Sequence, residues 1–172
     1  MARIEYLVVH HTATPTSWTV ERLRKLHVEQ NGWRDIGYHY VIRLNDEGFA
    51  ETHIGRPHDG STDLEPWEYG AHVRGSNSRS LGLAMVGNWS EDTPDPRIRV
   101  QLVGELIRLC IVHDLDSESI KGHNEMPDTS TECCGTLFDM EALRRDVAHQ
   151  LKTVKAVITG MEIWTSKNSG AS

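Results

Sequence analysis

The sequence contains no run of about 18 apolar residues, so we expect no helix that spans a membrane. Its first residues, MARIEYLVVHHTA, lack the long apolar segment and small-residue cleavage site of a secretion signal, so we expect no signal peptide. No stripe of basic residues is visible, and the net charge of the 172 residues is −7. Proteins that bind nucleic acid usually show such a stripe, so we expect no nucleic-acid partner.

The chain has only three cysteines, Cys110, Cys133 and Cys134. The odd count argues against a disulfide framework, as does the adjacency of two of them, because adjacent cysteines can bridge only in a strained ring. Cys110 lies at helical spacing among apolar residues, which predicts a place in the core. The two adjacent cysteines follow His123 in the segment GHNEMPDTSTECCG, which prompts a search for a metal site.

The length of the chain predicts one domain, since no internal repeat or low-complexity linker divides it. Alternating and continuous apolar runs predict strands at residues 3–11, 38–44, 49–54 and 81–87. Helical periodicity and capping residues predict helices at residues 19–32, 96–112 and 138–151, with Thr19, Asp95 and Asp139 as N-caps. This order predicts an α/β fold, a single domain with a mixed β-sheet flanked by helices.

The pattern weakens after about residue 155, where the sequence resembles a chain end with few ordering contacts. We therefore predict a domain at residues 1–154 and a C-terminal tail at residues 155–172. The tail is expected to add a strand or an extra contact, and its last residues are expected to be disordered. The irregular residues 55–79 predict a long loop that is functional or contains a short helix.

Histidine and cysteine provide candidate metal ligands. His10 and His11 end the first predicted strand, and their side chains point to opposite faces, so both cannot readily bind one ion. A histidine there, His123 and Cys133 would give zinc three protein ligands and an open fourth position, which is typical of a hydrolytic site. Imidazole and thiolate favour zinc over magnesium or calcium. The spacing from His123 to Cys133 by itself is also compatible with a chance arrangement of the two residues.

Four blocks of sequence occur in a familiar order: VVHHTAT, WRDIGYHYVI, GAHVRGSNSRSLGLAMVGNW and GHNE…TECCG. Over residues 4–151 the chain resembles the zinc-dependent type-2 N-acetylmuramoyl-L-alanine amidases. That family includes phage endolysins, and the animal peptidoglycan recognition proteins share its fold. The resemblance implies this fold and a zinc hydrolase that cleaves the amide between N-acetylmuramic acid and L-alanine in bacterial peptidoglycan.

The resemblance implies His10, His123 and Cys133 as the ligands of Zn²⁺. Cys134 stands where the family has proline, and its two interpretations are an inert neighbour and an alternative ligand. The resemblance also implies catalytic roles for Tyr38 and Thr131, as hydrogen-bonding groups for the oxyanion that forms at the attacked carbonyl.

The family block that contains His72 implies substrate contact at the edge of the cleft, against solvent exposure as the alternative. Glu125 is close in sequence to His123, and a role in supporting the loop competes with a role as general base. Tyr38 could equally be a core aromatic residue. The remaining histidines show no partner pattern and are predicted at the surface or in helices: His27, His53, His58, His113 and His149.

Three functions follow from these features. The first is a phage-type endolysin, a monomer made in the host cytoplasm and released to the cell wall, with peptidoglycan as its partner. The second is a non-catalytic peptidoglycan-binding module, against which Cys133 argues, because relatives that only bind usually lack the cysteine ligand. The third is a cytoplasmic amidase that recycles soluble muropeptides with the same metal and the same bond.

Overall fold

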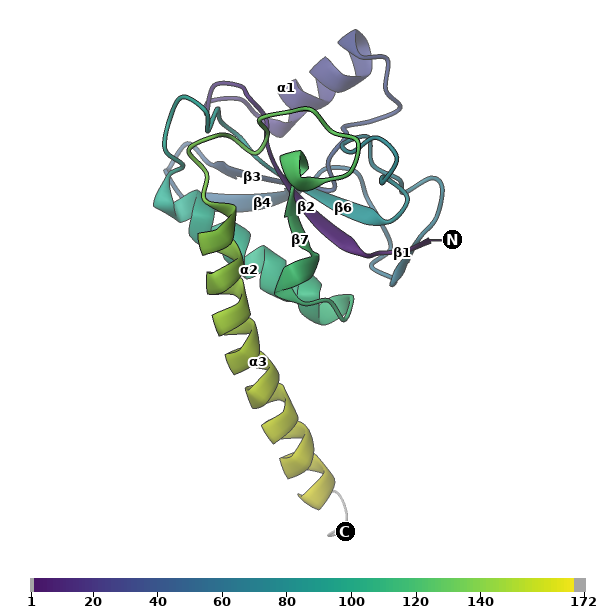
Figure 1. Cartoon of the computed structure of the whole chain (residues 1–172), viewed down its shortest axis with the longest axis vertical. Helices are drawn as coiled ribbons and strands as arrows, with labels where there is room; N and C mark the ends of the chain where they lie inside the picture. Colours follow the sequence, from purple (N-terminus) through teal and green to yellow (C-terminus); the bar gives the residue numbers. More distant parts are fainter. Residues whose placement is uncertain (1, 169–172) are drawn as a thin grey trace.

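The computed structural model describes the backbone of residues 2–168 and the side chains of residues 2–161. Its centre is a five-stranded mixed sheet in the order β4-β3-β6-β2-β7 (Figure 1). The strands are β2 (Tyr6–His11), β3 (Tyr40–Leu44), β4 (Ala50–Ile54), β6 (Ser80–Met85) and β7 (Ile120–Gly122). All neighbours are parallel except β3 and β4. The chain is a single α/β domain, and the prediction of a mixed sheet flanked by helices is confirmed.

Two helices cover one face of the sheet. α2 (Pro96–Val112) begins as predicted, with Pro96 in the first turn and the Asp95 carboxylate accepting from the backbone of Arg97 at 2.8 Å. α3 (Met140–Asn168) begins after Asp139, whose carboxylate accepts from the backbone of Ala142. Their apolar stripes and the facing strand residues form the main core, which includes Leu7, Val9, Leu83, Met85, Leu102, Leu106, Leu143 and Val147.

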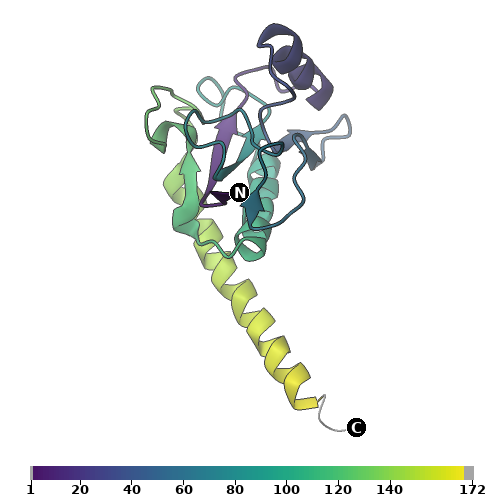
Figure 2. The same ribbon diagram turned by 90° about the vertical axis from the view of Figure 1, so that its right-hand side faces the viewer.

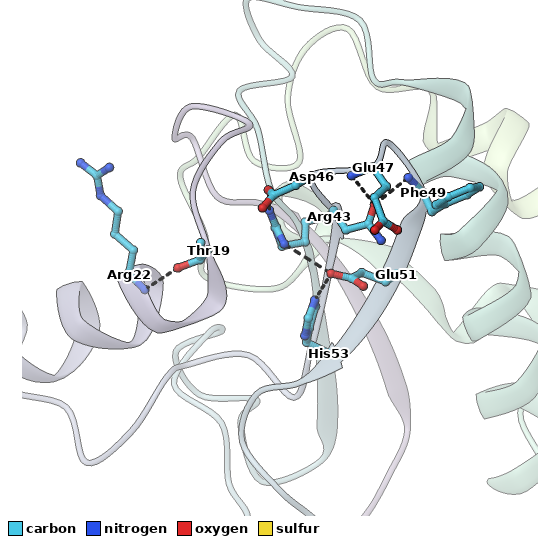
Figure 3. Close-up of polar contacts among 9 residues, drawn as sticks. Thr19, Arg22, Arg43, Asp46, Glu47, Phe49, Glu51 and His53 are labelled. Atoms are coloured by element: carbon cyan, nitrogen blue, oxygen red, sulfur yellow. Dashed lines mark hydrogen bonds and ion pairs between the residues drawn. The ribbon is translucent and has the colours of Figure 1, made fainter.

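The predicted helix at residues 19–32 is shorter and of two kinds. α1 (Val20–Lys25) starts at Thr19, whose hydroxyl accepts from the backbone of Arg22 as expected for the N-cap (Figure 3). A π-helical turn, η1 (Leu26–Gln30), follows. Val20 and Leu23 pack on Val41 of β3 and on Val86, the residue after β6, so this segment is attached to the sheet by a second, smaller core.

The hairpin between β3 and β4 is closed by side chains at its turn. The Asn45 carboxamide oxygen accepts from the backbone of Glu47 and of Phe49, which closes a turn at residues 45–48 between the two strands. Figure 3 shows the cross-strand pair between Arg43 and Glu51, which lie opposite each other in the register. These contacts fix the edge of the sheet farthest from β7.

The predicted strand at residues 3–11 is interrupted. β1 (Ala2–Arg3) pairs with β5 (Asp63–Leu64), and β2 starts only at Tyr6. Between them, the backbone of Ile4 donates to the carbonyl of Thr62 and that of Glu5 to the carbonyl of Arg79. Loops distant in sequence therefore satisfy the backbone there, which no local pattern could indicate.

The segment at residues 55–79, all of it described, contains β5 and no helix, so the alternative of a short helix is wrong. Arg56 holds it in place from inside. This buried guanidinium donates to the carbonyls of Asp35 and Ile36 at 3.0 Å and also to that of Tyr69. The loop is thereby fastened to the residues that lead into Tyr38.

α3 continues through the predicted boundary at residues 154 and 155 without a break in the helix. A strand after residue 155 is therefore wrong over the described residues, and the predicted disorder concerns residues that lie outside them. Figures 1 and 2 both show this helix extending away from the sheet, and Val157 is exposed. Within the described part of the chain, no helix is long and apolar enough to span a membrane.

Candidate metal centre

Parallel strand register brings two histidines together at one edge of the sheet. Val9 of β2 lies opposite Gly122 of β7, so the residues that follow, His10 and His123, emerge side by side. Their ring centroids are 4.6 Å apart. His10 ends β2 together with His11, whereas His123 opens a short 3-10 helix, η3 (His123–Glu125). This carboxyl edge of parallel strands is where α/β sheets commonly hold their ligands.

Cys133 completes a group of three possible ligands. Its Sγ lies 3.6 Å from Nδ1 of His10, and one ligand atom from each of His10, His123 and Cys133 lies within 4.8 Å of the others. No fourth histidine, cysteine or carboxylate joins them among the described residues. Two imidazoles and one thiol fit zinc, and three protein ligands leave one position open for chemistry.

The two adjacent cysteines face different surroundings. Cys133 is half-buried, with Sγ directed at His10 and also 3.7 Å from the carbonyl oxygen of His11. Cys134 is 1% exposed and belongs to the main hydrophobic core. Of the two interpretations of Cys134, this position favours the inert neighbour.

Burial sets the protonation of the three groups. It lowers the pKa of His10 well below its ordinary value, with further lowering by His72 and His123, and it also lowers the pKa of His123. Burial raises the pKa of the Cys133 thiol to about 11. At neutral pH both imidazoles are therefore neutral and able to donate a lone pair, whereas the thiol must release its proton when a metal binds.

Tyr38 lies beside this group. Its ring centroid is 5.2 Å from that of His10, and burial raises its pKa well above the ordinary value, with Cys133 adding to the effect. The phenol therefore stays protonated and can donate a hydrogen bond. Thr131 is exposed, and its hydroxyl oxygen accepts from the backbone N–H of Cys133 at 3.1 Å, which shapes the turn that carries the sulfur.

Glu125 supports the loop around His123. Its carboxylate accepts from the backbone N–H of Gly122 at 2.7 Å and pairs with Arg144 at 2.8 and 3.0 Å. Both carboxylate oxygens are engaged, and Arg144 and the Gly122 N–H hold the pKa of Glu125 below its ordinary value despite partial burial. The geometry favours the supporting role over that of a general base.

His72 lies inside the protein rather than on a flexible loop. It is 7% exposed, and its Nδ1 is 3.1 Å from Nε2 of His10, on the side of the His10 ring opposite Cys133. The alternative of solvent exposure is wrong. Contact with substrate stays a prediction, and the observed neighbour of His72 is a proposed metal ligand.

His27 lies in the helical turn η1 and His149 is exposed on α3, so both agree with the prediction of a surface or helical position, although His27 is buried. His113 is buried just after the end of α2, so the prediction is wrong for this residue. His27 accepts from the backbone N–H of Gly37 at 3.1 Å, and its ring lies 5.4 Å from that of Tyr38. The spacing of Val20, Leu23 and His27 on one helical stripe was the available signal for this burial.

Comparison with known proteins identifies amidases, phage endolysins and peptidoglycan-recognition proteins as relatives. Residues 1–136 match the family described as N-acetylmuramoyl-L-alanine amidase. A human protein of that name is 30% identical over 164 residues, which are 87% of this chain and 25% of the relative, so the chain spans about a quarter of that protein. The endolysin of Klebsiella phage KP32 is 39% identical over 83 residues, 47% of this chain and 46% of the relative. The solved structure of the N-acetylmuramoyl-L-alanine amidase LysC from Clostridium intestinale URNW has a TM-score of 0.70 and 27% identity, covering 85% of this chain and 86% of its own.

Proposed function

The chain belongs to the N-acetylmuramoyl-L-alanine amidase family, and from this premise we propose that it is a zinc-dependent hydrolase of peptidoglycan. The bond it cleaves is the amide between N-acetylmuramic acid and L-alanine. The observation that carries the proposal is the convergence of His10, His123 and Cys133, with no fourth ligand from the described residues. A closed set of four would indicate a structural metal, whereas an open set of three suits hydrolysis.

His10, His123 and Cys133 would hold the ion. When bound, zinc lowers the pKa of a coordinated water to about 7 and polarises a carbonyl oxygen. The neutral imidazoles need no proton loss to bind, and the thiol supplies the one negative charge of the ligand set. This reduces the net charge of the centre from +2 to +1.

Tyr38 acts on the substrate side of this centre. As the amide carbonyl is attacked, negative charge grows on its oxygen, and a protonated phenol nearby can donate a hydrogen bond to it. Thr131 is the second such donor in the proposal. Its oxygen already accepts from the backbone of Cys133, which leaves its O–H available to donate.

The biological setting proposed is that of a phage-type endolysin, a monomer made in the host cytoplasm and acting on the cell wall after release. The endolysin of Klebsiella phage KP32 supports this setting. A non-catalytic peptidoglycan-binding module and a cytoplasmic amidase that recycles soluble muropeptides are the two competing functions. Cys133 beside His10 favours a catalytic protein over the binding module.

The deciding experiment digests purified peptidoglycan with the metal-free protein, with and without added zinc, and analyses the products by mass spectrometry. New L-alanine amino termini should appear only with zinc, and the Cys133→Ala variant should produce none. Faster release from intact sacculi than from soluble muropeptides would support the endolysin, and the reverse would support recycling. Binding to wall fragments without bound zinc or product would establish the non-catalytic alternative.

A further inference from the structure

We propose that His72 is a positioning residue that fixes the orientation and the tautomer of His10, so that Nδ1 of His10 is free to bind the metal. This inference rests on the metal centre of the proposed function. Its basis is a directed series of hydrogen bonds from His10 through His72 to Ser80, buried behind the ligand group.

The Ser80 end of this series has only acceptors for His72. Nε2 of His72 lies 3.4 Å from the carbonyl oxygen of Ser80 and 3.5 Å from its hydroxyl oxygen. A carbonyl can only accept, and the Ser80 hydroxyl donates its single hydrogen to the carbonyl of Ser76 at 2.7 Å. Nε2 of a neutral His72 must therefore carry the proton to make either bond.

The remaining proton positions follow from this one. A neutral imidazole protonated on Nε2 has a lone pair on Nδ1, so Nδ1 of His72 is an acceptor. Its partner at 3.1 Å, Nε2 of His10, must then be the donor. His10 consequently has no proton on Nδ1, which is the nitrogen that lies 3.6 Å from Cys133 Sγ. If His72 were instead the donor in its hydrogen bond with His10, the proton of a neutral His10 would lie on Nδ1, and that nitrogen would have no lone pair for the metal.

The ring of His72 is held in a space that admits little movement. A Cβ on Gly82 would lie 2.7 Å from Cγ of His72, and a Cβ on Gly70 would lie 2.5 Å from its Cδ2. The backbone N–H of His72 donates to the carboxamide oxygen of Asn77 at 2.9 Å. Glycines in β6 and in the loop before His72 therefore let the ring approach the sheet closely, and Asn77 fixes the backbone behind it.

The burial of His10 makes this partner consequential. His10 is 1% exposed, so its Nε2–H has no access to bulk water if His72 is removed. A buried donor without a partner is costly, and the ring can relieve that cost by turning or by moving its proton to Nδ1. Either response weakens metal binding, because a ligating imidazole depends on the group that holds its other nitrogen.

The test compares two substitutions at one position. In His72→Asn the carboxamide oxygen is attached to the same carbon as Nδ1 and keeps an acceptor for His10, whereas His72→Leu removes it. Zinc affinity is measured by competition with a chromogenic chelator. We expect the leucine variant to bind zinc about 10–100-fold more weakly than the wild type and the asparagine variant to recover most of that loss. His113→Leu is the control, since His113 is also buried and its ring neighbour is His58 rather than His10, and it should bind zinc as the wild type does.

Two outcomes would overturn the role of His72: equal zinc affinity of the wild type and the leucine variant, or equal losses in the asparagine and leucine variants. If the leucine variant does not fold, NMR of the imidazole nitrogens in the metal-free wild type decides instead. It should find both His10 and His72 protonated on Nε2, and a proton on Nδ1 of either would overturn the proposal. A wild type that binds no zinc would refute the proposed metal centre, while the NMR result would still judge the contact between the two histidines.

Discussion

The number of protons released when zinc binds depends directly on the burial of the three ligands. The experiment titrates zinc into the metal-free protein at pH 6. A ligand contributes a released proton only if it is protonated before binding. The count therefore reports the protonation of His10, His123 and Cys133 in the folded protein.

The expected count is close to one. At pH 6 an ordinary imidazole, with a pKa of about 6.5, is about three-quarters protonated, so two such ligands would release about 1.5 protons in addition to that of the thiol. Here burial lowers the pKa of both His10 and His123, whereas the pKa of Cys133 is about 11. The thiol is then the main source, and zinc affinity should rise as pH increases because binding competes with that proton.

Calorimetry in two buffers of different ionisation enthalpy measures the count. Cys134→Ala is the matched control and should still release close to one proton, because Cys134 lies in the core. Cys133→Ala should release almost none. It should also bind zinc more weakly by about 3 kcal/mol, roughly a quarter of the 10–16 kcal/mol typical of sites with four protein ligands.

Two results would refute the reasoning. A count of two or more in the wild type would mean that the imidazoles are charged and that their burial does not control them. A normal count in Cys133→Ala combined with a lost proton in Cys134→Ala would assign the ligand to Cys134.

Three further predictions concern single side chains. Tyr38→Phe should keep its zinc, by metal analysis, and lose about 10²–10³-fold in turnover of peptidoglycan, whereas an unchanged rate would make Tyr38 structural. Glu125→Gln should stay within about tenfold of wild-type turnover because both oxygens of Glu125 already support the loop, and a loss of 10²–10⁴-fold would identify a general base. Burial and the nearby His58 and Arg108 lower the pKa of His113 to about 4. Below pH 6.5 this histidine therefore becomes protonated in the unfolded state but stays neutral in the folded state, which lowers the stability of the folded protein. The measurement is the free energy of unfolding from urea titrations at pH 7.5 and at pH 5, with a chelator present. On going to pH 5 the wild type should lose about 2 kcal/mol more of this free energy than His113→Leu does. Equal losses in the two proteins would contradict the prediction.

Much of the fold was predictable because local chemistry specifies it. The N-caps Thr19, Asp95 and Asp139 mark helix starts by satisfying backbone N–H groups within three residues. The turn at Asn45 works over four residues. The break in the first predicted strand was not predictable, since it depends on the carbonyls of Thr62 and Arg79.

The candidate metal centre was likewise predictable in part. The sequence by itself determined the candidate donor types, two histidines and a cysteine, because each stands in a recognisable block of residues. Tertiary structure decided which atoms converge. The resemblance assigned the ligand position to Cys133, but only the folded turn shows that its sulfur faces His10 while Cys134 lies in the core.

His72 shows most clearly what cannot be predicted from the sequence. It lies 62 residues from His10 in the sequence. The residues next to His72 in the chain do not indicate that its ring packs against Ser80 and Gly82 of β6. A one-dimensional pattern identifies a histidine but not which of its two nitrogens carries the proton. That choice belongs to the tertiary structure, because it is set by acceptors that folding brings to the ring.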